Sequence, residues 1–414
     1  MLRCCNGDPG FVIKTKGIVA LASTIRGANN TSPRAMLQRQ KIVVLFAVLL
    51  VILSIMAWPF ARSHLQAITV LRQVSGQGVP RIFTTIVTEP IRTEDVQFST
   101  AAGVVRARLY LPMHHQNAPG LMILHGVHHE GIDEPRMMSF ASAMASCGLQ
   151  VLTPELPGIK DYHVDRDSVK VIGESARWFA GRTAAPVGVM GLSFSGGLAL
   201  VAAADPEYQS AFKFVLAVGS QDAMEHVASY YLTSREPRPD GSFEELPPHE
   251  YGALVMEYEH LEDFVPAGDE GAVRAVLREH LYEDKSAQAL AEARLNARQK
   301  VEAARLMDSS SSATKALLAV SNQKHRQEME QLSPHGILRT MTTPVYLLHG
   351  RADNIIPSAE SMWMASELPS STLKEVLISP VLSHLNMDGS NPGMWDQWEI
   401  VHLFAVVMDA AERK

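Results

Sequence analysis

The chain has few cysteines: three in 414 residues, of which only Cys147 lies outside the N-terminal tail. A single cysteine cannot form a disulfide within the folded part, and no Cys-x-x-Cys or Cys/His spacing typical of zinc sites occurs. The chain also lacks a cluster of basic residues, and its net charge is −7 at pH 7. Nucleic-acid-binding proteins carry such a basic face, so we expect no nucleic-acid partner.

Charged residues are absent from one long run, residues 42–61, in which apolar side chains dominate. About 20 such residues match the hydrocarbon thickness of a bilayer when helical, and Trp58 suits the membrane interface. Residues 1–41 carry an excess of basic side chains, so we expect this tail in the cytosol and the remainder of the chain on the extracytoplasmic side. Residues 62–89 are interpreted as a tether.

Two alternatives stay open for this membrane segment. The apolar run is longer than that of an ordinary signal peptide and no good cleavage site follows it, which favours an uncleaved anchor. Residues 36–41 nevertheless resemble the start of a secretory signal. Cleavage is therefore an alternative to anchoring, and Met36 is an alternative to Met1 as the first residue.

Strand and helix patterns alternate in residues 90–222 and again in residues 342–414. The predicted strands cover residues 95–100, 104–112, 120–126, 149–154, 187–192, 212–219, 344–350 and 373–379. The predicted helices between them cover residues 134–147, 167–182, 358–368 and 395–411, with another that ends at residue 204. Strands separated by helices require crossover connections, so we predict an α/β fold with a mostly parallel, doubly wound sheet and helices on both faces. Gly103 between the first two strands predicts a hairpin.

Residues 223–341, here called the insertion, interrupt this alternation with helical patterns and no convincing strand. The predicted helices cover residues 251–264, 271–282, 287–307 and 314–332. Within the third, apolar residues recur every three or four positions, at Leu290, Ala293, Ala297, Val301 and Ala304. This spacing predicts a long amphipathic helix. We interpret the insertion as a helical domain placed between two strands of the sheet.

The strand predicted at 187–192 meets a turn with the sequence Gly191-Leu-Ser-Phe-Ser-Gly-Gly197 and then a helix. A serine at the tip of a strand-turn-helix is the arrangement of a nucleophile elbow, in which the serine has a strained backbone and its neighbours must be small. Ser193 meets this requirement. Ser195 occupies the place where a second glycine is common, and it stays an alternative nucleophile.

A nucleophilic serine needs a base and a carboxylate that orients the base. Asp353 comes just after the strand at 344–350, and His384 just after the next strand. The order serine, acid, histidine is that of α/β-hydrolases, and all three residues follow the carboxyl ends of predicted parallel strands, where such sheets bind ligands. Asp222, which follows the strand at 212–219, is an alternative acid.

With these motifs the sequence resembles the α/β-hydrolase superfamily, in its branch of capped serine hydrolases. The resemblance extends from about Asp95 to the C-terminus, without the insertion. The motifs that carry it are His125-Gly126, Gly191 to Gly197, Gly350-Arg-Ala-Asp353 and Ser383-His384. Each motif alone is weak, but four in the right order on the right elements are a specific signal.

The resemblance implies a role for each motif. Ser193 would be the nucleophile, His384 the base and then the acid, and Asp353 the carboxylate that orients the histidine. The backbone N–H groups of Val127 and Phe194 would form the oxyanion hole. Two further side chains, those of His128 and His129, are expected to line the mouth of the site and contact the substrate.

The predicted activity is hydrolysis of a carboxylic ester or thioester through an acyl-serine intermediate, with no cofactor and no metal. The insertion would cover the site as a cap, and the substrate would be a small-molecule or lipid-like ester. The alternatives are an acyltransferase or a peptidase that uses the same triad, and a noncatalytic binding module on the same fold.

Overall fold

The computed structural model describes residues 33–384 and 392–413, and residues 1–32 of the predicted cytosolic tail lie outside them. The chain divides into two units, Met1–Pro59 and Phe60–Lys414. In the first unit the described residues belong to α2, a helix that runs from Pro33 to Val74 and continues into the second unit. From residue 41 to Pro59 the side chains of α2 are exposed. The helix is long and apolar enough to cross a membrane.

The last part of α2 is helical where we expected a tether. Two side chains about one turn apart, those of Ala67 and Val70, are completely buried in the second unit. The Gln66 side chain donates a hydrogen bond of 2.7 Å to the Cys147 carbonyl. No strong helix breaker follows Pro59 until Gly76, whose positive φ of 68° is accessible to glycine and ends the helix. A short helix, α3 (Arg81–Val87), occupies much of the remaining predicted tether.

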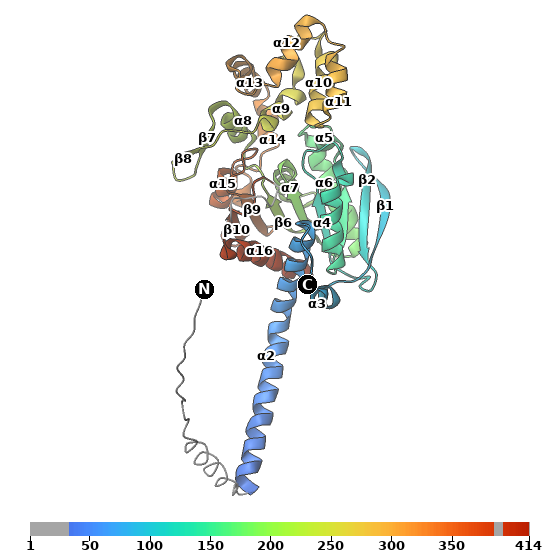
Figure 1. The fold of residues 1–414 in the computed structure, drawn as a ribbon, viewed down its shortest axis with the longest axis vertical. Coiled ribbons are helices and arrows are strands. Elements are labelled where there is room, and N and C mark those ends of the chain that lie inside the picture. The colour runs from blue at the N-terminus through green and yellow to red at the C-terminus, as the bar shows by residue number, and fades with distance from the viewer. Residues whose placement is uncertain (1–32, 385–391, 414) are drawn as a thin grey trace, which may run out of the picture. The chain divides into compact units, whose positions relative to one another are not determined.

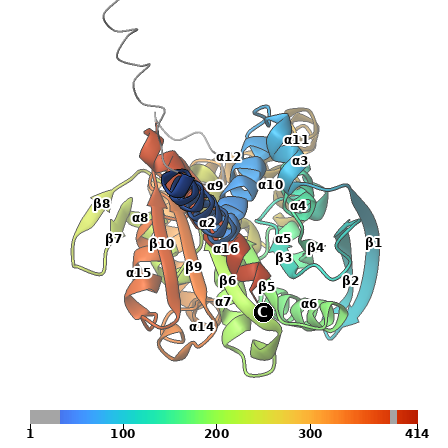
Figure 2. The same cartoon turned by 90° about the horizontal axis from the view of Figure 1, so that it is seen from below.

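The second unit is built on an eight-stranded sheet in the order β1-β2-β4-β3-β5-β6-β9-β10. The strands are β1 (Ile91–Thr100), β2 (Gly103–Pro112), β3 (Gly120–Leu124), β4 (Gln150–Pro154), β5 (Val187–Leu192), β6 (Phe212–Val218), β9 (Val345–Gly350) and β10 (Leu373–Ser379). β2 pairs antiparallel with β1 and with β4, and the other pairs are parallel. Figure 2 shows the strands in this order from β1 on the right to β10 on the left. The predicted sheet and its first hairpin are confirmed.

Helices cover both faces of the sheet because its inner strands alternate buried apolar side chains between two cores. On one face Leu121 and Ile123 pack with α4 (Pro135–Ser146), α16 (Met394–Glu412) and the end of α2. On the other face Met122 and Leu124 pack with α6 (Arg166–Thr183) and α7 (Phe194–Ala204). The remaining elements of these layers are η2 (Gly131–Asp133), α5 (Pro157–Lys160), η3 (Gln209–Ala211) and α15 (Ala359–Glu367). The helices packed on both faces hold the strands, and with them the loops at the strand ends, in place.

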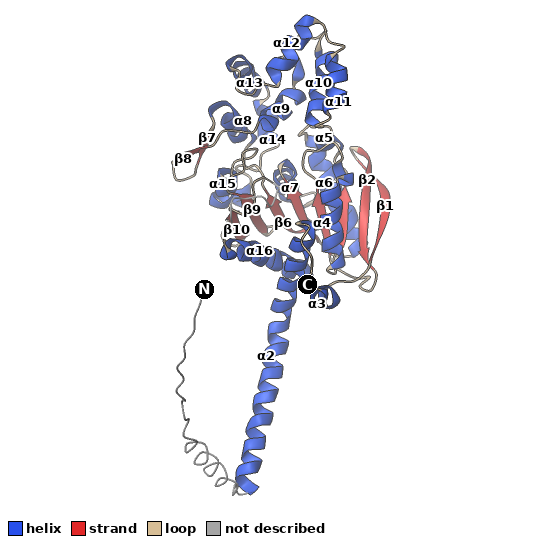
Figure 3. Ribbon diagram, viewed as in Figure 1, coloured by secondary structure: helices blue, strands red, loops and turns tan. Residues whose placement is uncertain are grey.

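The insertion lies beyond one end of the strands, where Figures 1 and 3 show its helices grouped together. Its helices are α8 (Met224–Thr233), α9 (Glu250–Glu259), η4 (Leu261–Asp263), α10 (Glu270–Leu281), α11 (Lys285–Glu292), α12 (Ala297–Leu306), α13 (Ser312–Lys324), α14 (Arg326–Gln331) and η5 (Leu338–Thr340). The prediction of no strand was wrong. The short strands β7 (Arg235–Pro237) and β8 (Phe243–Glu245) form a hairpin of their own.

The long amphipathic helix predicted at 287–307 is two helices, α11 and α12. The first ends at Glu292, and Asn296 starts the second, because its side chain and that of Gln299 form a capping box. The predicted apolar face is exposed, with Leu290 and Val301 both 66% accessible. The buried side of α12 instead carries Ala303 and Leu306. The apolar spacing is helical, but it lies on the exposed side of both helices, and α11 has no buried residue.

Candidate active site

Ser193 stands between β5 and α7 in a strained backbone conformation, with φ at 57° and ψ at −137°. The surrounding residues are small because the turn is tight: a Cβ on Gly191 would lie 2.4 Å from the Cα of Gly196. A positive φ is unfavourable for a residue with a side chain, and such strain persists only where the surrounding structure imposes it. The backbone of this turn thus has the geometry of the predicted elbow.

Three polar side chains meet at the carboxyl ends of β5, β9 and β10. The Nε2 atom of His384 lies 3.0 Å from the Oγ atom of Ser193. The Nδ1 atom of the same imidazole lies 2.6 Å from Oδ2 of Asp353. A carboxylate only accepts hydrogen bonds, so Nδ1 carries the proton and Nε2 is free to accept from the serine hydroxyl. The structure brings together the three residues predicted as nucleophile, base and acid.

Asp353 is completely buried yet surrounded by donors. Its Oδ1 atom accepts the backbone N–H groups of Ile355 and Ile356 at 2.9 and 3.0 Å. The buried His349 places Nε2 3.4 Å from Oδ2. Burial alone would raise the pKa of Asp353, but the neighbouring His384 and His349 outweigh it and lower the pKa to about 2. The carboxylate is ionised at neutral pH and holds the imidazole of His384 in one orientation.

The strand order, the strained serine and the crossover helices together decide the architecture. The chain has the α/β-hydrolase fold. In this fold the loop after the third strand faces the elbow, and here Ser195 links the two, because its Oγ atom donates a 2.6 Å hydrogen bond to the carbonyl of His125. Ser195 is therefore occupied in holding the loop, and among the described residues it is Ser193 that contacts His384.

No protein-family model and no curated protein matches the chain. Among solved structures it is similar to an esterase from Pyrobaculum calidifontis, with 17% identity, a TM-score of 0.45, and coverage of 84% of this chain and 92% of that one. It is also similar to the esterase domain of a Rhodothermus marinus protein, with 15% identity, a TM-score of 0.41, and coverage of 77% of this chain and 98% of that one. A third similar structure is that of 2-hydroxy-6-oxo-6-phenylhexa-2,4-dienoate hydrolase from Rhodococcus, with 16% identity, a TM-score of 0.38, and coverage of 75% of this chain and 97% of that one. A shared fold does not determine the reaction.

The predicted oxyanion donors lie on the two elements that flank the serine. Phe194 is the first residue of α7, and Val127 is a buried residue in the loop after β3. The carbonyl of Val127 accepts a 2.7 Å hydrogen bond from the hydroxyl of Tyr251, which belongs to α9 of the insertion. The insertion therefore fixes the peptide groups of the loop that carries one predicted donor.

His129 contacts the insertion as well, and His128 stacks on His129. Their rings stack on each other with centroids 4.6 Å apart, and His129 stacks on Tyr282 at 4.2 Å. Burial, and next the neighbouring His129, lower the pKa of His128. The Nδ1 atom of His129 is buried without a hydrogen-bond partner in the described part of the chain. Their predicted contact with substrate stays a prediction.

The alternative acid, Asp222, is paired with a different histidine. Its Oδ2 atom lies 2.7 Å from Nδ1 of His335, at the end of the insertion. Its backbone N–H donates to Glu360 on α15 at 2.8 Å. Burial, and next the charge of Glu360, raise the pKa of Asp222 to about 7. In the structure the acid bonded to His384 is Asp353, and Asp222 takes no part in that contact.

Sequence reasoning missed three residues that shape the site: His349, Tyr251 and Gly219. His349 is near the end of the strand predicted at 344–350, directly before the motif that we used for Asp353. Tyr251 was assigned to an apolar helix face, and no local signal pairs it with Val127. Gly219 has a φ of 58°, and a Cβ there would lie 3.3 Å from Oδ2 of Asp353 and 3.5 Å from Nδ1 of His384. The Gly-Ser-Gln-Asp turn after a strand was the available signal for this last position.

Proposed function

We propose that the protein is a membrane-anchored serine hydrolase that cleaves a carboxylic ester or thioester through an acyl-serine intermediate. One observation carries the proposal: a single imidazole, that of His384, bridges a strained serine and a buried, ionised aspartate. Strained serines and buried carboxylates each occur for structural reasons. Their convergence on one histidine is the arrangement that nucleophilic catalysis needs.

In the proposed reaction the Oγ atom of Ser193 attacks the carbonyl carbon while Nε2 of His384 takes the serine proton. The negative charge on the carbonyl oxygen is stabilised by the N–H groups of Phe194 and Val127, each contributing about 3 kcal/mol by analogy with removal of single donors. His384 returns its proton to the leaving alcohol or thiol. Water then attacks the acyl-serine while His384 takes a proton from it. His384 returns this proton to the Oγ atom of Ser193 as the bond between Oγ and the acyl carbon breaks, and the carboxylic acid leaves.

The substrate would be a small-molecule or lipid-like ester that enters past the insertion. Ser193 is only 4% exposed, so a substrate can reach it only when the covering segments move. The segments in contact with the site loops are α9 through Tyr251 and α8 through Tyr231, whose hydroxyl donates to the Ile355 carbonyl at 2.9 Å. We propose that these two contacts close the site and exclude water.

A fluorophosphonate probe tests the nucleophile. The full chain in detergent should be labelled and Ser193→Ala should lose labelling. Ser195→Ala, which removes the hydrogen bond to the His125 carbonyl but leaves the proposed nucleophile, should still be labelled, although more slowly. A series of p-nitrophenyl esters, a thioester and peptide amides then separates hydrolase from peptidase, and an added alcohol acceptor tests for acyl transfer. A folded wild-type protein that does not label would indicate the noncatalytic binding module instead.

We also propose that the tail before α2 is cytosolic and that the hydrolase unit lies on the extracytoplasmic side, as the basic residues of the tail suggest. Cys147 is buried and does not interfere with thiol labelling. With Cys4 and Cys5 changed to serine, Ser242→Cys in the exposed β7–β8 turn should react with a membrane-impermeant maleimide in intact cells. Reaction only after lysis would reverse the orientation.

A further inference from the structure

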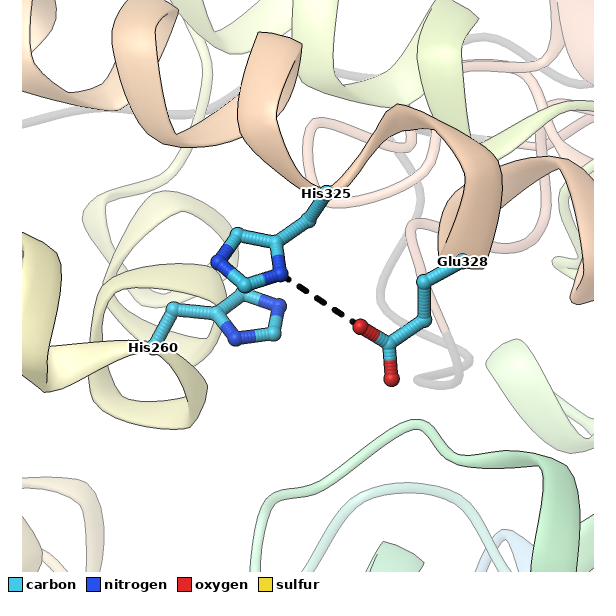
Figure 4. Close-up of side chains that lie close together, drawn as sticks. All are labelled: His260, His325 and Glu328. Carbon is cyan, nitrogen blue, oxygen red and sulfur yellow. Dashed lines mark ion pairs between the residues drawn. The ribbon is translucent and has the colours of Figure 1, made fainter.

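A cavity within the insertion brings two histidines and a glutamate together, far along the chain from the triad. His260 ends α9, His325 lies between α13 and α14, and Glu328 is in the first turn of α14. One ligand atom from each of the three residues lies within 4.8 Å of the others. Figure 4 shows the two imidazoles stacked and the glutamate directed at His325. The proposed hydrolytic reaction uses none of these residues.

The orientation of His325 is fixed from behind by a carboxylate. Its Nε2 atom lies 2.9 Å from Oδ2 of Asp263. Asp263 also accepts from Ser321 at 2.8 Å and pairs with Lys324. Asp263 thus holds the Nε2 side of the ring, and the Nδ1 atom of His325 faces Glu328. Metal-binding histidines are commonly held by a carboxylate in this way.

The distances suit a small cation rather than a direct hydrogen bond. The Nδ1 atom of His325 lies 3.4 Å from Oε2 of Glu328. In a tetrahedral zinc site with bonds of about 2.0–2.1 Å, ligand atoms lie about 3.3 Å apart. His260 stacks on His325 with ring centroids 3.5 Å apart and planes 8° apart. An imidazole ligates through a lone pair in its ring plane, so His260 must rotate out of this stack, and its ligand atom must move from at most 4.8 Å to the tetrahedral spacing.

A further observation favours a bound group in this cavity. Asn322 also lines the cavity, and its Nδ2 atom is buried without a partner in the described part of the chain. A water or anion on the fourth position of a metal ion would give that amide an acceptor.

We propose that His260, His325 and Glu328 bind one divalent transition-metal ion, with Zn²⁺ the best match to two imidazoles and one carboxylate. The ion would join the end of α9 to the start of α14. Since α9 also carries Tyr251, which holds the Val127 carbonyl, the ion would stiffen the helix that supports the site loop. This proposal is independent of the hydrolytic activity.

A second group of similar residues, Asp222, His335 and Glu367, offers the internal comparison. There Nδ1 of His335 faces both carboxylates, at 2.7 and 3.2 Å, and a proton on it serves both. The guanidinium of Arg339 lies 3.2 Å from Glu367 and opposes a cation. In this group Glu367 already pairs with an arginine, whereas no basic side chain pairs with Glu328 in the described residues except His325.

Cobalt and zinc binding test the proposal on the tag-free full chain, stripped with a chelator. We expect one equivalent of Co²⁺ with visible absorption bands of a tetrahedral ion, displaced by one equivalent of Zn²⁺. Asp263→Asn should weaken binding by about 10- to 100-fold, because it removes only the orienting carboxylate. His260→Ala should weaken it further, Glu328→His should retain it, and the control His335→Ala should leave it unchanged.

Several results would overturn the site. One is the absence of stoichiometric Co²⁺ or Zn²⁺ binding to the folded wild-type chain. Another is loss of binding in His335→Ala with binding retained in His260→Ala, which would place the ion in the second group. Circular dichroism of each variant, and retained binding in Glu328→His, separate loss of a ligand from loss of the fold. Fluorophosphonate labelling of Ser193 is read in parallel, so failure of one proposal does not decide the other.

Discussion

Two aspartate–histidine pairs with nearly the same geometry follow neighbouring strands of this sheet. Asp353, after β9, lies 2.6 Å from Nδ1 of His384, and Asp222, after β6, lies 2.7 Å from Nδ1 of His335. Both aspartates are completely buried. Their pKa values nevertheless move in opposite directions, to about 2 for Asp353 and about 7 for Asp222.

The difference lies in the charges around each pair, since burial alone raises the pKa of any carboxyl group. Asp353 has two imidazoles and two backbone N–H groups as partners. Asp222 shares its surroundings with Glu360 and Glu367, and its Oδ1 atom is buried without a partner in the described residues. Position in the fold makes both aspartates available, and the local charges determine which one is held as an anion beside its histidine.

The largest expected effect comes from replacing the carboxylate of each pair by an amide. Asp353→Asn should lower kcat for a p-nitrophenyl ester by on the order of 10⁴-fold, because the amide stabilises the wrong tautomer of His384. Asp222→Asn should lower it by less than about tenfold, since its effect reaches the site only through packing. Steady-state kinetics on both variants, with labelling of Ser193, measures the contrast. Equal losses would show that the acid is shared or misassigned.

Stability against pH should change in opposite directions for the two aspartates. The ordinary pKa is 3.8 and the folded pKa of Asp222 is about 7, so the folded state keeps a proton that the unfolded state releases. The free energy of unfolding therefore falls as pH rises from 4 to 7, by up to about 4 kcal/mol. Relative to wild type, Asp222→Asn should gain stability between pH 5 and 8 in denaturant titrations.

For Asp353 the sign is reversed. Its folded pKa of about 2 lies below 3.8, so its contribution is complete above pH 4 and is lost as pH falls toward 2. The contribution is about 2 kcal/mol. Compared with wild type, Asp353→Asn should be destabilised at pH 5, and this deficit should shrink toward pH 2. A deficit that does not depend on pH would mean that Asp353 is not held as an anion by its partners.

The sequence was sufficient to predict the residues of the first pair but not the difference between the pairs. Each motif of the triad is local: the small residues around Ser193, and an acid or a histidine just after a strand. The charges that decide between Asp353 and Asp222 come from Glu360 and His335, which are more than 100 residues from Asp222. Whether these two side chains come close to Asp222 depends on how the insertion rejoins the sheet, and the spacing of apolar residues in the sequence does not predict that.

The same limit explains what was missed elsewhere in the fold. Strand positions follow from short apolar runs between turns, and they were predicted within a few residues. The end of α2 packs on the sheet through Ala67 and Val70, which by themselves are too small to mark a core contact in a sequence. Tyr251 contacts Val127 across 124 residues. Local pattern thus predicted the elements, whereas tertiary contact decided their partners.

Gly219 connects the two pairs and offers a smaller perturbation. It lies on the turn that leads to Asp222, but a Cβ there would contact Asp353 and His384. Gly219→Ala should cost about 1–2 kcal/mol of stability, because its φ of 58° is unfavourable for alanine. It should also lower kcat by about tenfold with a smaller change in KM, through displacement of His384. Gly241→Ala, at a φ of 83° with open space around it, is the control for strain alone.

The smallest expected effect comes from one charge beside Asp222. The Oε2 atom of Glu360 accepts the backbone N–H groups of Asp222 and Ala223, and its Oε1 atom lies 3.3 Å from Nδ1 of His226. Glutamine at this position can still accept from the backbone through its carbonyl oxygen but carries no charge. Burial would lower the pKa of His226, yet Glu360 outweighs it and the pKa is raised.

Glu360→Gln should therefore lower the pKa of both Asp222 and His226, since the same anion favours protonation of each. Both groups favour the folded state at low pH in the wild type, and their contributions decline as pH rises through the folded pKa values. The variant should flatten the fall in stability between pH 5 and 8 by about 1 kcal/mol, while kcat changes less than about twofold. Thermal unfolding at the two pH values measures this difference. An unchanged slope would assign the raised pKa of Asp222 to burial alone, and a large loss of kcat would mean that the two pairs are one coupled network.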